Sequence, residues 1–98
     1  MERRRTSDLS REDAVPYFLW DEDTSVAELR RVLREGPESL RIHYVAKILR
    51  EARPEHAWLF FRPEDVRARW TEVRPRLGRM TAVWEFLFDQ WARDGLLA

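Results

Sequence analysis

The stretch LGRMTAVWEFLFDQWARDG, residues 77–95, has the most regular apolar pattern in the chain. Large apolar side chains recur there every three or four positions, a spacing that places them on one face of an α-helix. Arg79 is the safest start for this helix, because Gly78 weakens an earlier first turn, and Gly95 supplies its end. Phe86 lies opposite the apolar stripe, which predicts a second apolar surface. The stripe itself consists of Leu77, Met80, Trp84, Leu87, Phe88 and Trp91.

Proline and glycine divide the rest of the chain into shorter segments. The pattern predicts a helix over 26–35, with Ser25 as its N-cap and Gly36 at its end. A second helix is predicted over about 38–52, and its strongest apolar face leaves Lys47 on the polar side.

The tripeptide Arg-Pro-Glu occurs twice, at 53–55 and at 62–64. Proline suits the first position of a helix, where its missing N–H would have no partner, and the following glutamate interacts favourably with the helix dipole. The two copies therefore predict short helices that begin at about 54 and 63. No segment alternates with the period of a β-strand, so the predicted fold class is all-α: a compact bundle of four to five short helices with an N-terminal extended arm.

Length and composition predict one folded domain. The chain has 98 residues, and its 44% hydrophobic residues, with five tryptophans among them, can supply a core. Residues 1–13 place Leu9 among charges and hydroxyls, which predicts a mobile N-terminal tail. Residues 14–98 are predicted to form a single helical domain.

Charge and cysteine content restrict the surroundings in which the protein works. Eighteen basic and eighteen acidic residues cancel, so no overall field attracts the chain to a nucleic acid or an anionic membrane. The absence of cysteine suits a reducing compartment. No apolar run follows the basic start, as a signal peptide would require, and none reaches the ~20 residues of a membrane span. We therefore expect a cytoplasmic protein without membrane contact.

The titratable residues carry no signature of a catalytic or metal-binding site. His43 and His56 lie on different predicted helices, and neither has acidic or histidine neighbours at the spacing of a metal site. The sequence contains no glycine-rich phosphate loop and no nucleophile elbow. We therefore predict a protein that is not an enzyme, with no catalytic, metal or cofactor-binding residues.

An acidic segment with aromatic residues at its centre favours a protein partner. Between Glu12 and Glu28 the chain has six acidic residues and no basic one. Aromatic anchors surrounded by carboxylates are suited to a basic cleft, where charge guides the encounter and rings supply binding energy. The alternative is that the same rings close the protein's own core, and self-association also stays open. The predicted partner-binding residues are Tyr17, Phe18, Trp20, Asp21, Glu22 and Asp23, with Tyr44 and Phe86 as further contacts.

A basic stretch supports nucleic-acid binding as the alternative function. From 62 to 79 six arginines stand against three acidic residues, and aromatic and basic side chains are interleaved as in some single-strand binders. The excess of positive charge is modest, so a protein partner is favoured. The residues of this alternative site are Arg67, Arg69, Trp70, Arg74, Arg76 and Arg79.

Four segments together resemble a family of small bacterial helical proteins with a Tyr-Phe-x-Trp-Asp opening. The segments are PYFLWD, SVAELRRVLREG, IHYVAKILREARPEHAWLFFRPEDVRARW and VWEFLFDQW, which span about residues 16–92. Members of that family are commonly encoded beside nucleotidyltransferase-type toxins. The resemblance therefore implies an antitoxin-like role, with the cognate toxin or another neighbouring-gene product as the partner.

Overall fold

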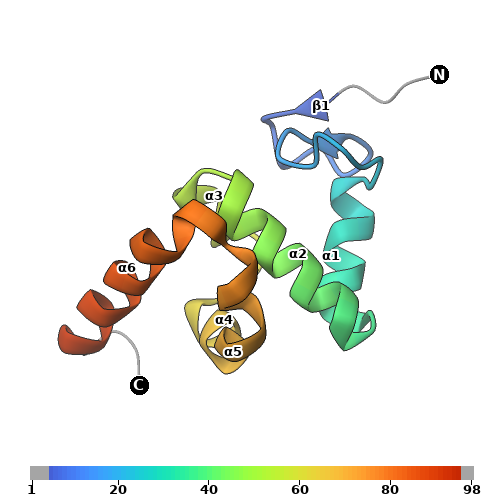
Figure 1. Cartoon of the computed structure of the whole chain (residues 1–98). Coiled ribbons are helices and arrows are strands. Elements are labelled where there is room, and N and C mark those ends of the chain that lie inside the picture. The colour runs from blue at the N-terminus through green and yellow to red at the C-terminus, as the bar shows by residue number, and fades with distance from the viewer. Residues whose placement is uncertain (1–4, 96–98) are drawn as a thin grey trace.

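The structure is a computed structural model that describes residues 5–95. The long helix α2 (Glu38–Glu51) lies at the centre of the fold. Helix α1 (Val26–Glu35) packs along it, and α3 (Pro54–Ala57) continues from its end. Figure 1 shows α2 running diagonally between α1 on one side and α6 (Thr81–Arg93) on the other. The short helices α4 (Pro63–Ala68) and α5 (Trp70–Val73) lie beneath α2 in the same view.

The predicted helix boundaries are confirmed where proline, glycine or an N-cap marks them. Helix α1 begins after Ser25, whose Oγ accepts the N–H of Glu28 at 3.2 Å. Helices α3 and α4 begin at Pro54 and Pro63, at the two Arg-Pro-Glu copies. Helix α3 has four residues and α4 has six, so both are short, as predicted.

The segment before α6 differs from the prediction. Arg74–Arg76 and Gly78–Met80 form two 3₁₀ turns, and the α-helix itself begins at Thr81. Gly78 has φ +54, a left-handed conformation that interrupts a regular helix. The described residues therefore contain six α-helices and two 3₁₀ turns instead of four to five helices, although the helical class of the fold is as predicted.

The N-terminal segment also differs from its prediction. Residues 1–4 lie outside the described part, but β1 (Arg5–Thr6) pairs in parallel with β2 (Val15–Pro16), and the N–H of Tyr17 bonds to Thr6 O at 2.8 Å. Leu9 between the strands is 5% exposed. Instead of a mobile tail, residues 5–13 are folded against the domain, because Leu9 and the β1 backbone both find partners there.

The core lies between α2 and its neighbours. Ile48 and Leu49 of α2 are fully buried, as are Leu29 of α1 and Trp84 of α6. Phe86 points away from this core and is 66% exposed, as its position opposite the apolar stripe predicts.

Candidate functional site

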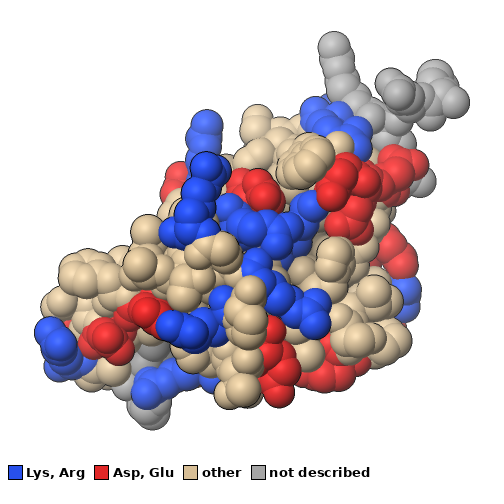
Figure 2. Space-filling view, in the orientation of Figure 1, with Lys and Arg blue, Asp and Glu red and all other residues tan. Residues whose placement is uncertain are grey.

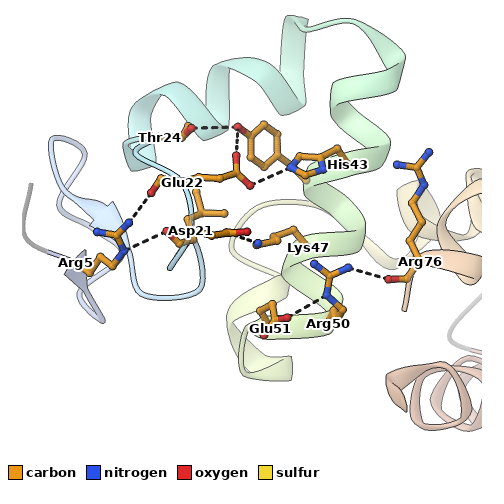
Figure 3. Close-up of polar contacts among 11 residues, drawn as sticks. Arg5, Asp21, Glu22, Thr24, His43, Lys47, Arg50, Glu51 and Arg76 are labelled. Carbon is orange, nitrogen blue, oxygen red and sulfur yellow. Dashed lines mark hydrogen bonds and ion pairs between the residues drawn. The ribbon is translucent and has the colours of Figure 1, made fainter. Parts of the chain in front are cut away.

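Trp20 is the most exposed aromatic residue of the predicted partner-binding segment, with 62% of its surface accessible. Its ring is nevertheless held in place, because Nζ of Lys47 lies 5.0 Å from the ring centroid. Lys47 emerges from α2 with a side chain only 3% exposed, and it forms an ion pair with Asp21. Figure 3 shows this pair linking the N-terminal segment to α2. The hydrogen bond from Lys47 lowers the pKa of Asp21 below its usual value.

Glu22 ties the same segment to α2 at a second point. Its carboxylate lies 3.0 Å from His43 Nε2 and accepts the Tyr44 hydroxyl proton at 2.9 Å. Thr24 Oγ1 lies 3.1 Å from the same hydroxyl. Burial raises the pKa of Tyr44, and Glu22 acts in the same direction. These contacts lie in the upper part of Figure 3 and attach the segment that follows Trp20 to α2.

A third attachment comes from β1. Arg5 Nη2 donates to Glu22 O at 2.8 Å, and Arg5 Nε donates to Leu19 O at 3.2 Å. The backbone on both sides of Trp20 is therefore held by one guanidinium (Figure 3). The Trp20 surface, by which we mean Trp20, Asp21 and Asp23, is thus attached to α2 and β1 by several contacts.

Two of the predicted partner contacts are corrected by the structure. Phe18 is 1% exposed and packs edge-to-face on Phe60, with ring centroids 5.6 Å apart. Tyr44 is 7% exposed and turned toward Glu22. Both side chains belong to the protein's own core, because the N-terminal segment folds over the side of α2 that helical spacing marks as polar.

Tyr17 is half-buried and has a structural role. Its hydroxyl lies 2.8 Å from His56 Nδ1 and accepts the N–H of Arg53 at 2.8 Å. The ring thus joins the N-terminal segment to the start of α3. Among the predicted contacts, Trp20, Asp21, Asp23 and Phe86 are the exposed ones.

The arginines of the alternative site are spread over several elements. Arg69 makes a two-point ion pair with Glu38 at 2.7 and 3.3 Å, and Arg74 pairs with Glu85 of α6. Trp70 is half-buried against Phe88, with ring centroids 5.3 Å apart. Arg67, Arg76 and Arg79 are exposed.

Basic side chains outside the predicted stretch also take part in contacts between elements. Figure 2 shows Lys and Arg atoms gathered across the middle of one face, with Asp and Glu atoms beside them. Arg50 of α2 donates to Arg76 O at 3.0 Å and to Glu51 at 3.0 Å, as drawn in Figure 3. The sequence prediction did not include Lys47 and Arg50, because only the tertiary packing of the N-terminal segment and of Arg74–Arg76 on α2 creates their contacts.

Comparisons with protein families, with curated proteins and with solved structures gave no match. Within residues 5–95, no group of three or more histidine, aspartate or glutamate side chains is placed to hold a metal ion. Among the helices of the same residues, none combines the length and the apolar composition needed to cross a bilayer.

Proposed function

We propose that the protein is a non-enzymatic, antitoxin-like regulator that binds a partner protein and covers its basic substrate cleft. The observation that carries this proposal is the Trp20 surface. A tryptophan that is 62% exposed yet fixed by Lys47 presents a large apolar group whose conformation is already selected. Tryptophan is enriched among the residues that dominate binding energy, and a preorganised side chain loses little entropy when it binds.

The charge around Trp20 suits a basic partner. Asp21 and Asp23 are exposed on either side of Glu22, and Asp23 has no ion-pair partner within the described part of the chain. A carboxylate that is not neutralised internally can accelerate association with a cleft lined by arginine and lysine. The resemblance to proteins encoded beside nucleotidyltransferase-type toxins supplies the partner class, since such a cleft binds phosphates.

A second contact is available on α6. Phe86 is 66% exposed and Val83 beside it is 44% exposed. In Figure 1, α6 lies at the end of the molecule opposite β1. A partner that covers both surfaces must therefore extend along the molecule. If the partner contacts only the Trp20 surface, substitutions on α6 should not change its affinity.

Calorimetric titration of the full chain with the protein encoded by the neighbouring gene tests the proposal. We expect a micromolar or tighter complex that Trp20→Ala weakens by roughly 30-fold, the ~2 kcal/mol of a hot-spot residue. Leu40→Ala is the matched control, because Leu40 is also exposed but lies two turns before Lys47 on α2. No complex at ~10 μM, or equal losses in the two variants, would reject the Trp20 surface as the binding site.

The steering component has a separate test. Asp23→Lys should slow association and make its rate less sensitive to salt, while dissociation changes little. An association rate that does not change would remove Asp23 from the proposal and leave Trp20 in it.

Nucleic-acid binding remains the alternative, with less support. Arg69 and Arg74 are engaged by Glu38 and Glu85, so phosphates would have to displace those carboxylates. A gel shift at low salt that disappears at high salt and in Arg79→Gln would favour this alternative.

A further inference from the structure

A hollow between α1, α2 and the segment 60–69 uses residues outside the Trp20 surface. Its volume is about 390 Å³, within the ~300–1,000 Å³ of small-molecule sites. The described residues that line it include four arginines and one carboxylate, that of Asp65. The hollow is therefore locally basic, although the whole chain carries no net charge. The arginines are Arg30, Arg34, Arg41 and Arg69.

Two of these guanidinium groups are held by neutral groups. Arg30 Nη1 donates to Leu59 O at 2.8 Å, and its Cζ lies 4.7 Å from the centroid of the Phe60 ring. Arg41 Nη2 donates to Arg34 O at 2.8 Å. Carbonyls and a ring fix the position of a guanidinium without cancelling its charge, so both groups remain able to bind an anion.

The other charged groups of the wall are more fully engaged. Arg69 is paired with Glu38, and Arg34 has Glu35 within 3.3 Å on the exposed side of α1. Asp65 accepts the N–H of Arg62 at 3.0 Å, at the start of α4. Arg30 and Arg41 are therefore the main source of positive charge, and Arg34 adds to it.

Arg41 also has an unused donor. Its Nε is buried and has no hydrogen-bond partner among the described residues. A buried N–H without an acceptor is unfavourable, and such groups are rare in folded proteins. Arg30 and Arg34 are also unfavourably placed, because like charges four residues apart on a helix repel each other. An anion in the hollow would offset this repulsion and would attract the Arg41 guanidinium.

We propose that this arginine pocket binds a small phosphate ester. The phosphate would lie among Arg30, Arg34 and Arg41, because planar guanidinium groups present paired donors that match phosphate oxygens. Phe60 and Phe61 are half-buried in the wall, and they offer an apolar surface to a flat or apolar remainder of the ligand. The Trp20 surface is not involved, so this proposal is independent of the proposed partner-binding function.

Calorimetry with three probes tests the pocket on the full chain: adenosine monophosphate, adenosine and inorganic phosphate. We expect adenosine monophosphate to bind more tightly than phosphate, and adenosine to give no heat. Arg34→Gln should weaken adenosine monophosphate by about tenfold, the loss expected for one charge-assisted hydrogen bond. Its side chain is 68% exposed, so the variant keeps the fold. Arg76→Gln, an exposed arginine outside the pocket, is the control and should leave the affinity unchanged.

Nuclear magnetic resonance adds a readout for the buried donor. The Nε–H signal of Arg41 should shift when adenosine monophosphate is added and stay in place with adenosine. Equal affinity for adenosine and its phosphate would overturn the proposal, as would equal losses in Arg34→Gln and Arg76→Gln. Affinity for inorganic phosphate that matches the ester would also overturn it, since Phe60 and Phe61 would then recognise nothing. Tighter binding of a single-stranded oligonucleotide that both arginine variants weaken alike would assign the charge to a nucleic-acid surface instead.

Discussion

Trp84 Nε1 donates a hydrogen bond to Leu49 O at 2.7 Å, and both side chains are fully buried. Leu49 lies in the last turn of α2, where backbone carbonyls have no partner within the helix. The indole therefore satisfies an acceptor at the helix end while its ring fills the core between α2 and α6. One side chain thus satisfies a carbonyl at the end of α2 and attaches α6 to it.

Trp84→Phe should destabilise the protein by about 1–3 kcal/mol, because Leu49 O loses its donor inside the core. The smaller ring adds a packing loss in the same direction. Urea unfolding followed by circular dichroism measures the change. Trp20→Phe is the control: its ring is exposed, and the free energy of unfolding should stay within about 0.5 kcal/mol. Equal losses in the two variants would contradict the role given to the buried hydrogen bond.

Tyr17→Phe tests how the N-terminal segment is attached to α3. Removal of the hydroxyl leaves the N–H of Arg53 and Nδ1 of His56 without their partner, and we expect a loss of about 1–2 kcal/mol in the free energy of unfolding. A double-mutant cycle with His56→Ala isolates the direct contact. Strictly additive losses would mean that the hydroxyl and the imidazole do not stabilise each other.

Local signals in the sequence predicted the helices well, and long-range packing explains what they missed. Ser25, Pro54 and Pro63 act within one turn of the chain, so the helix starts they predict are where the structure has them. Lys47 and Tyr44 lie on the side of α2 that helical spacing marks as polar, and both are buried. The N-terminal segment covers that side, a contact between residues more than twenty positions apart that no periodicity reveals.

The sequence did not distinguish the exposed from the buried residues of the predicted partner-binding segment, because that too depends on long-range packing. An aromatic segment has the same sequence pattern whether its rings face solvent or the core. In this protein Phe18 is buried and Trp20 is exposed. The arginine pocket could not be predicted at all. Arg30, Arg41 and Phe60 belong to three separate segments, and each taken alone resembles an ordinary surface or core position.

The ion pair between Lys47 and Asp21 should make stability depend on pH. The hydrogen bond from Lys47 lowers the pKa of Asp21 in the folded protein, relative to about 3.9 in an unfolded chain. A lowered folded-state pKa contributes stability above the unfolded value, and this contribution is lost as the pH falls through the folded value. Asp21→Asn should therefore be less stable than the unmodified protein at pH 7, and the difference should shrink below about pH 4.

The two partners of this pair should respond differently to removal. Asp21→Ala leaves an ammonium group that is almost fully buried without its carboxylate, whereas Lys47→Met leaves a carboxylate that water can reach. We therefore expect Asp21→Ala to be the more destabilising change at pH 7. Urea unfolding of both variants measures this order, and the reverse order would show that the apolar stem of Lys47 matters more than its charge.

Gly36 and Gly78 should resist substitution for different physical reasons. Gly36 has an extended backbone that any residue adopts, but an added Cβ would lie 2.7 Å from Val32 O and 2.8 Å from Val32 Cγ1. Gly78 has φ +54 and open space around the missing Cβ. Alanine should destabilise both positions, by about 1–3 kcal/mol through overpacking at Gly36 and by about 1–2 kcal/mol through backbone strain at Gly78.

Asparagine separates the two causes, because it tolerates the left-handed conformation better than alanine but is bulkier. Gly78→Asn should be more stable than Gly78→Ala, while Gly36→Asn should be no better than Gly36→Ala. Urea midpoints of the four variants test this crossover. Recovery by asparagine at Gly36 would show that its backbone, rather than the contact with Val32, requires glycine. Failure of asparagine at Gly78 would show that the turn before α6 tolerates no side chain, despite the open space around it.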